Sequence, residues 1–104
     1  MTTTTRSKTA QEIYNEITAH INKSPHSTSS WYAGITQDIE QRLFGAHNVS
    51  KDNSWWIHQK ARTSTDARSV EEALLNWGCD GGSGGGDNDA VYVYAYHKAA
   101  NTKR

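Results

Sequence analysis

The amino-acid sequence predicts an α+β domain in which three helices flank one small, antiparallel sheet of three strands. Two observations lead to this prediction. Apolar residues recur at helical spacing in three segments, and three other segments alternate apolar and polar residues with period 2. The segments alternate along the chain as helix, strand, helix, strand, helix and strand. Three strands covered by helices are also about the smallest sheet that is stable in water.

Composition limits the size and the setting of this domain. The 104 residues suffice for one modest core, with residues 1–6 expected as a disordered tail, 7–98 as a single domain and 99–104 as a basic tail. The formal net charge of zero argues against a dedicated basic clamp on nucleic acid. The single cysteine, Cys79, excludes an internal disulfide and indicates a reducing compartment, so we expect a cytoplasmic protein without a membrane partner.

The first helix and the first strand follow one another in the first third of the chain. Thr9 and Glu12 have the spacing of a capping box, and the helix that they open carries three isoleucines one turn apart. These are Ile13, Ile17 and Ile21. Ser24-Pro25 ends this helix. In the strand 31–36, Tyr32, Gly34 and Thr36 share one face, and Gly34 leaves room above it.

A second helix is expected directly after this strand. Either Thr36 or Asp38 can accept a hydrogen bond from the first helical turn. The buried stripe that follows consists of Ile39, Leu43 and Ala46. Arg42 lies beside this stripe, where a guanidinium needs an anion; the alternative is a surface arginine that pairs with a carboxylate. Polar residues from Gly45 to Ser54 then predict a loop.

The second strand is predicted at residues 55–62. Trp55, Ile57 and Ala61 face one side of it, and Trp56, His58 and Lys60 face the other. His47 and His58 lack the spacing of a zinc pair, which favours packing or surface histidines over metal ligands.

The third helix is expected to begin with a second capping box, Ser69 to Glu72. Its core face consists of Val70, Ala73, Leu74 and Trp77. In this arrangement Glu72 reaches back to the cap, while Glu71 lies at the margin of the buried face and requires a cation. The purely structural interpretation is a salt bridge from Glu71 to Arg42, Arg62 or Lys60.

The C-terminal part combines a glycine-rich connection with the most strand-like run of the chain. Residues 78–89 lack the pattern of a phosphate loop, which favours a permissive surface loop over a substrate groove. In residues 89–97, three tyrosines alternate with apolar residues, as expected for a strand. They are Tyr92, Tyr94 and Tyr96.

The strand-to-helix junction in the middle of the chain resembles the second half of the GIY-YIG nuclease signature. The residues that carry the resemblance are Tyr32-Ala33-Gly34, Thr36, Asp38, Ile39, Arg42-Leu43 and His47. Glu71, with Leu74 three positions on and Trp77 three further, resembles the glutamate helix of the same family. Together these residues cover about the middle half of the chain.

The resemblance implies hydrolysis of phosphodiester bonds in nucleic acid by a divalent-metal-dependent endonuclease, with DNA favoured over RNA. By this resemblance the catalytic residues are Tyr32, Arg42 and Glu71. Glu71 would ligate Mg²⁺ or Mn²⁺, Arg42 would neutralise the phosphate, and Tyr32 would position or deprotonate water. The substrate-binding residues would be Gly34, Thr36, His47 and Tyr94. The alternative is a catalytically inactive module of the same fold that binds a protein or a nucleic acid.

In the family, a strand with the "GIY" element precedes the "YIG" strand, whereas this chain has a helix and a loop there. We predict that residues 91–96 lie beside the strand 31–36 and take the place of the missing strand, as in a circular permutation. Tyr94, the central tyrosine, would then meet Arg42. The alternative is that the three tyrosines pack under helices, which is common for aromatic residues on a strand.

Overall fold

The computed structural model describes residues 8–47, 49, 55–81 and 90–98, and the predicted tails at 1–6 and 99–104 lie outside these ranges. It confirms the α+β fold with a three-stranded antiparallel sheet. The elements are α1 (Ala10–Lys23), η1 (Thr28–Ser30), β1 (Trp31–Thr36), η2 (Glu40–Ala46), β2 (Trp56–Lys60), α2 (Ser64–Trp77) and β3 (Tyr92–His97). None of the described helices is long and apolar enough to cross a membrane.

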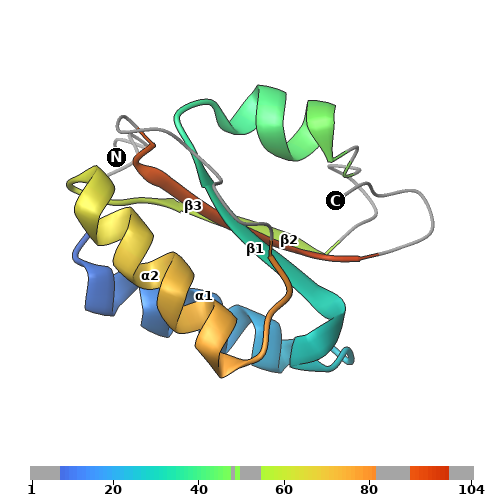
Figure 1. Cartoon of the computed structure of the whole chain (residues 1–104). Helices are drawn as coiled ribbons and strands as arrows, with labels where there is room; N and C mark the ends of the chain where they lie inside the picture. Colours follow the sequence, from blue (N-terminus) through green and yellow to red (C-terminus); the bar gives the residue numbers. More distant parts are fainter. Residues whose placement is uncertain (1–7, 48, 50–54, 82–89, 99–104) are drawn as a thin grey trace, which may run out of the picture.

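The C-terminal strand β3 is the central strand of the sheet (Figure 1). It pairs antiparallel with β1 on one side, from Trp31 opposite His97 to Thr36 opposite Tyr92. On the other side it pairs antiparallel with β2. The prediction that the tyrosine-rich segment lies beside the strand 31–36 is therefore confirmed. The first strand of the chain and its last strand form the longest pairing of the sheet.

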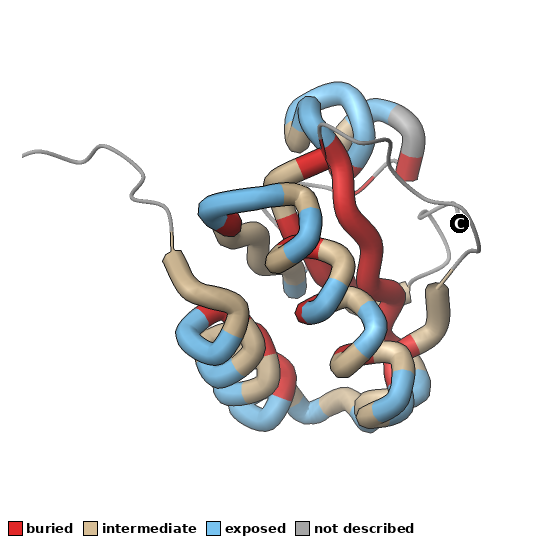
Figure 2. Tube along the Cα trace, turned by 60° about the vertical axis from the view of Figure 1, so that its left-hand side comes forward, coloured by how far each residue is buried: buried red, intermediate tan, exposed pale blue. Residues whose placement is uncertain are grey.

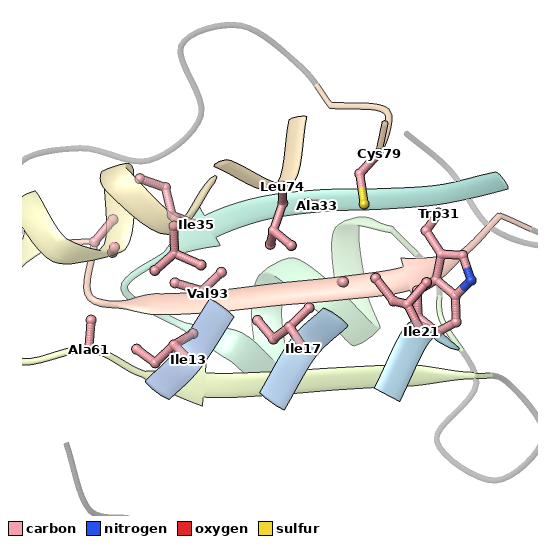
Figure 3. Close-up of a cluster of buried hydrophobic side chains, with 14 residues drawn as sticks. Ile13, Ile17, Ile21, Trp31, Ala33, Ile35, Ala61, Leu74, Cys79 and Val93 are labelled. Carbon is pink, nitrogen blue, oxygen red and sulfur yellow. The ribbon is translucent and has the colours of Figure 1, made fainter. Parts of the chain in front are cut away.

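The two faces of the sheet carry different side chains. Helices α1 and α2 pack on one face, and η2 lies on the other (Figure 1). Under α1 and α2 lies the main core, which Figure 3 shows between the isoleucines of α1 and the strands. Under η2 lies a second, largely aromatic cluster. Its buried members are Tyr32, Leu43, Val49, Tyr94 and Tyr96. We call the side of the sheet that carries this cluster the tyrosine face.

Helix α1 has the cap and the buried stripe that its sequence predicts. The Thr9 side chain accepts a hydrogen bond from the Glu12 amide, and Glu12 Oε1 accepts one from the Thr9 amide. Its three isoleucines are at most 1% exposed, and Figure 2 shows the same alternation of buried and exposed positions along the helix. Local sequence therefore determines this helix from cap to core face.

Helix η2 is wider than the α-helix that the spacing predicts. The His47 amide donates to the Arg42 carbonyl, five residues earlier, at 3.0 Å. Of the two alternatives for the cap, Asp38 is the one used, because its Oδ1 accepts from the Gln41 amide at 3.2 Å. His47, four residues after Leu43 and on the same side of the helix, is buried as well. The Ala46 side chain, predicted in the stripe, lies outside the described residues, as do 48 and 50–54 of the predicted loop.

Two predicted helix boundaries are wrong, and two strands are shorter than predicted: β2 is Trp56–Lys60 rather than 55–62, and β3 is Tyr92–His97 rather than 89–97. Gly45 belongs to η2 and not to a loop, and α2 begins at Ser64 rather than near Ser69. The Thr63 side chain accepts from the Asp66 amide, so Ser69 lies inside the helix and Glu72 does not reach a cap. Thr63 rather than Ser69 caps the helix because the earlier start adds Ala67, which is fully buried, to the core face of α2.

Substitution of Thr63 by Ala is expected to lower the free energy of unfolding by about 1 kcal/mol, because it removes the cap of α2. Substitution of Glu72 by Ala should change it by less than about 0.5 kcal/mol, because this side chain is exposed and away from the cap. Urea denaturation followed by circular dichroism measures both values. A larger loss of unfolding free energy for Glu72→Ala than for Thr63→Ala would indicate that the helix begins near Ser69.

Candidate functional site

The candidate site is centred on Tyr94 in the middle of the tyrosine face. Tyr94 lies opposite Gly34 on β1 and opposite His58 on β2, and it is 1% exposed. A Cβ atom at position 34 would lie 2.5 Å from Tyr94 Oη and 2.7 Å from its Cζ. The room that Gly34 leaves above β1 is therefore filled by the Tyr94 ring.

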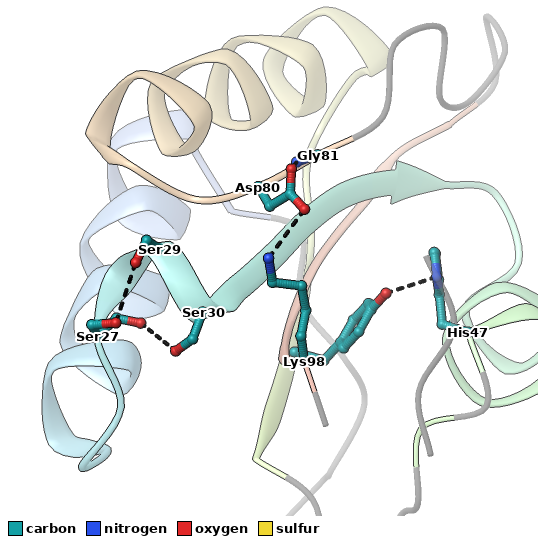
Figure 4. A network of polar contacts seen from close by, with 8 residues as sticks. Ser27, Ser29, Ser30, His47, Asp80, Gly81 and Lys98 are labelled. Atoms are coloured by element: carbon teal, nitrogen blue, oxygen red, sulfur yellow. Dashed lines mark hydrogen bonds and ion pairs between the residues drawn. The ribbon is translucent and has the colours of Figure 1, made fainter. Parts of the chain in front are cut away.

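His47 connects the end of η2 to this strand. Its Nε2 lies 2.8 Å from Tyr94 Oη, and its Nδ1 lies 2.9 Å from Tyr96 Oη. A neutral imidazole has one donor and one acceptor nitrogen, so one tyrosine donates to it and the other accepts from it. His47 is 3% exposed, and Figure 4 shows one of these two contacts. Of the two alternatives for His47, a surface or a packing histidine, the structure shows the packing one: His47 is a buried bridge between two phenols.

Tyr32 completes the aromatic cluster from β1. Its ring stacks on Tyr96 with centroids 5.3 Å apart, and it lies 5.0 Å from the His47 ring. Tyr96 was not among the predicted site residues. The period-2 alternation of β3 puts Tyr96 on the same face as Tyr94, so a signal for it was present in the sequence.

Three predicted site residues act on the Tyr94 hydroxyl. Burial raises the pKa of Tyr94 to about 12, and the hydrogen bond that Arg42 donates to its oxygen opposes this rise. The charges of Tyr32 and Glu71 raise the same pKa further, whereas the charge of Arg42 lowers it. Arg42 is exposed and comes from η2. The predicted meeting of Arg42 with Tyr94 is thus confirmed.

Glu71 and Arg42 come from different layers, since α2 and η2 lie on opposite faces of the sheet. Glu71 is half-buried, as expected for the margin of the core face of α2. Burial raises the pKa of Glu71; Arg68 lowers it, and Glu72 raises it. The cation beside Glu71 is therefore Arg68, and not Arg42, Arg62 or Lys60 as the salt-bridge interpretation proposed. Burial outweighs the effect of Arg68, so the pKa of Glu71 stays raised.

The remaining predicted site residue, Thr36, lies at the end of β1. It is 8% exposed, and its Oγ1 accepts from the Asp38 amide at 3.0 Å. This contact shapes the turn that leads into η2. Among the described residues, no three His, Cys, Asp or Glu side chains gather closely enough to hold a metal by themselves.

The beginning of the glycine-rich connection lies along the outer edge of β1. The Ala33 amide donates to the Asp80 carbonyl at 2.9 Å, and the Asp80 amide donates to the Trp31 carbonyl at 2.7 Å. Lys98 Nζ lies 3.1 Å from Asp80 Oδ2, as Figure 4 shows. The prediction of a free surface loop is wrong for these residues, because Gly78, at φ 132°, turns the chain back onto β1. Residues 82–89 lie outside the described ranges.

The burial of Tyr94 predicts a loss of stability at high pH. Its pKa rises from about 10 in the unfolded chain to about 12, so the folded state holds this proton more tightly. The contribution of Tyr94 is complete below pH 10 and disappears as the pH rises through 12. Urea denaturation at pH 9, 10 and 11 should show a smaller decline for Tyr94→Phe than for the wild type. Burial also raises the pKa of Cys79, to about 11. This thiol is present in both proteins, so its effect on stability cancels when their declines are compared. Equal declines would contradict the prediction.

Comparison of the chain with protein-family models, with curated proteins and with solved structures finds no match.

Proposed function

We propose that this chain is a divalent-metal-dependent endonuclease that hydrolyses phosphodiester bonds in nucleic acid, with DNA favoured over RNA. The observation that carries the proposal is the packing of the tyrosine face, where Tyr94 lies over Gly34 and Tyr32 stacks on Tyr96. Arg42, Tyr32 and Glu71 come from three different elements, and all three influence Tyr94. These are the residues that the resemblance to GIY-YIG nucleases selects. Cys79 is a buried free cysteine, which supports a reducing compartment such as the cytoplasm.

The sheet order supports a permuted form of that family. Strand β3 lies between β1 and β2, next to the strand that carries Tyr32-Ala33-Gly34. In this proposal Tyr94 takes the part of the tyrosine of the missing first motif. Its close contact with Gly34 and its hydrogen bond from Arg42 support that assignment.

The chemistry assigns a separate task to each side chain. Arg42 binds the scissile phosphate through its planar fork of N–H groups and neutralises the charge that develops there. Tyr94 keeps its proton at neutral pH because its pKa is raised, so it orients Arg42 and does not act as a base. Tyr32 orients the attacking water, which loses its proton to solvent. The water oxygen forms a bond to phosphorus while the bond to the leaving oxygen breaks, and that oxygen takes a proton from solvent.

Glu71 fits the need for a metal ligand. Mg²⁺ commonly binds through one or two protein carboxylates, with waters and substrate phosphates as its other ligands. A half-buried carboxylate with a raised pKa suits such a substrate-completed site. When bound, Mg²⁺ or Mn²⁺ would polarise the scissile phosphate and make the attacking water easier to deprotonate.

The test is incubation of the chain with supercoiled plasmid and with single-stranded DNA in Mg²⁺ or Mn²⁺. We expect the wild type to cleave and Glu71→Ala to lose cleavage. Glu72→Ala is the matched control, because it removes an exposed carboxylate from the next position of the same helix. Equal cleavage by wild type and Glu71→Ala would refute the metal assignment, and no cleavage by the wild type would refute the proposed function.

The second candidate function is a binding module without chemistry. The burial of Tyr32 and Tyr94, which are 8% and 1% exposed, favours it, because their rings are enclosed by the protein itself. Titration of the chain with Mg²⁺ in a calorimeter separates the two candidates. A module without chemistry needs no metal site at Glu71. In that case the wild type and Glu71→Ala should give the same heat on titration with Mg²⁺.

A further inference from the structure

Beside the candidate site, the tyrosine face continues onto β2 as a row of half-buried side chains. Trp56 lies opposite Tyr96, His58 opposite Tyr94, and Lys60 opposite Tyr92. The Trp56, His58, Lys60 and Tyr92 side chains are all partly open to solvent. We call these four residues the β2 row. From Trp56 to Lys60 it spans about 13 Å along the strand.

The rings of this row share one orientation. Trp56 and His58 lie in nearly parallel planes, 2° apart, with centroids separated by 5.8 Å. Phe44 of η2 contacts Trp56 edge-on at 5.0 Å and supports it from the side. Burial lowers the pKa of His58, although Glu40 opposes this, so the imidazole is uncharged at neutral pH and presents an aromatic face. The two rings stack on one another and Phe44 supports Trp56, so flat groups can extend this stack at its ends.

Positive charge comes from Lys60 at the far end of the row and from Arg42 of η2. Lys60 Nζ is 5.9 Å from the centre of the Tyr92 ring. Arg42 of η2 is exposed and interacts with Tyr94, the residue opposite His58. The row thus combines aromatic faces with a few cations.

From this geometry we infer that the β2 row binds single-stranded nucleic acid, two bases of which stack on Trp56 and His58 while Lys60 contacts a phosphate. The inference rests on the proposed function and specifies its substrate class. It also explains how a chain with zero net charge can bind nucleic acid. Duplex binding depends mainly on phosphate contacts, whereas aromatic stacking contributes affinity to a single strand, whose base faces are open.

Fluorescence anisotropy of a labelled ten-nucleotide oligothymidylate, at pH 7.5 in EDTA, tests this inference without any cleavage. We expect the wild type to bind the single strand at least tenfold more tightly than a ten-base-pair duplex. His58→Ala should weaken single-strand binding at least fivefold, because one stacking surface is lost. Lys60→Ala should weaken it and reduce the slope of log affinity against log salt by about one.

Lys23→Ala is the matched control for Lys60→Ala. It removes the same charge from the exposed end of α1, on the opposite side of the sheet, and should bind like the wild type. Equal affinity for duplex and single strand, wild-type affinity in both β2-row variants, or no binding at all would overturn the inference. Binding without cleavage in the Mg²⁺ assay would refute the proposed function and leave the inference standing. Cleavage of duplex without single-strand binding would refute the inference alone.

Discussion

Replacement of Arg42 by Ala is expected to reduce cleavage of nucleic acid by roughly two to three orders of magnitude. The guanidinium is the cation bonded to Tyr94, and no other residue of η2 carries a positive charge. Because Arg42 is exposed, its removal should leave the urea midpoint nearly unchanged. The rate of conversion of supercoiled plasmid to its nicked form, measured together with denaturation, separates loss of function from loss of fold.

Two further variants define the role of the guanidinium. Arg42→Lys keeps the charge but loses the planar fork, so it should recover only a small part of the activity. Arg62→Ala removes an exposed arginine outside the tyrosine-face cluster and should cleave like the wild type. Activity of Arg42→Ala within threefold of the wild type would mean that the phosphate is held elsewhere.

Replacement of Gly34 by Ala is expected to destabilise the protein by about 3 kcal/mol, the upper end of the usual cost of overpacking. The added methyl group would lie 2.5 Å from Tyr94 Oη and 2.7 Å from Cζ, well inside van der Waals contact. Tyr94 cannot move aside easily, because its hydroxyl is bonded to the buried His47. Chemical denaturation measures the loss directly.

Gly45→Ala is the matched control for this substitution. The nearest atom to an added Cβ at position 45 is the Glu40 carbonyl oxygen at 3.7 Å, an ordinary contact. This change should therefore be neutral or stabilising by up to about 1 kcal/mol, as expected for Gly to Ala inside a helix. Combining Gly34→Ala with Tyr94→Ala should cost less than the sum of the two single changes, since the clash partner is gone. Equal stability of Gly34→Ala and Gly45→Ala would contradict the packing of Tyr94 over Gly34.

Local patterns in the sequence determined the elements whose signals had no competitor. The capping box at Thr9 and the isoleucines after it specify α1, because the cap and the buried face agree. The alternation of residues 31–36 and of the three tyrosines likewise specifies β1 and β3 and assigns their faces. Glu71 at the margin of α2 and Arg42 beside the stripe of η2 also follow from helical spacing alone.

Only the tertiary structure decided between signals of similar strength. Thr63 and Ser69 both have the spacing of a cap, and the burial of Ala67 selects the earlier one. Spacing predicts a helix after Asp38 but not its width, which depends on how His47 meets the two tyrosines of β3. The sequence predicted that β3 lies beside β1, but not that it lies between β1 and β2. Period 2 assigns each side chain to a face but says nothing about which strand lies beside which, because that choice depends on long-range pairing.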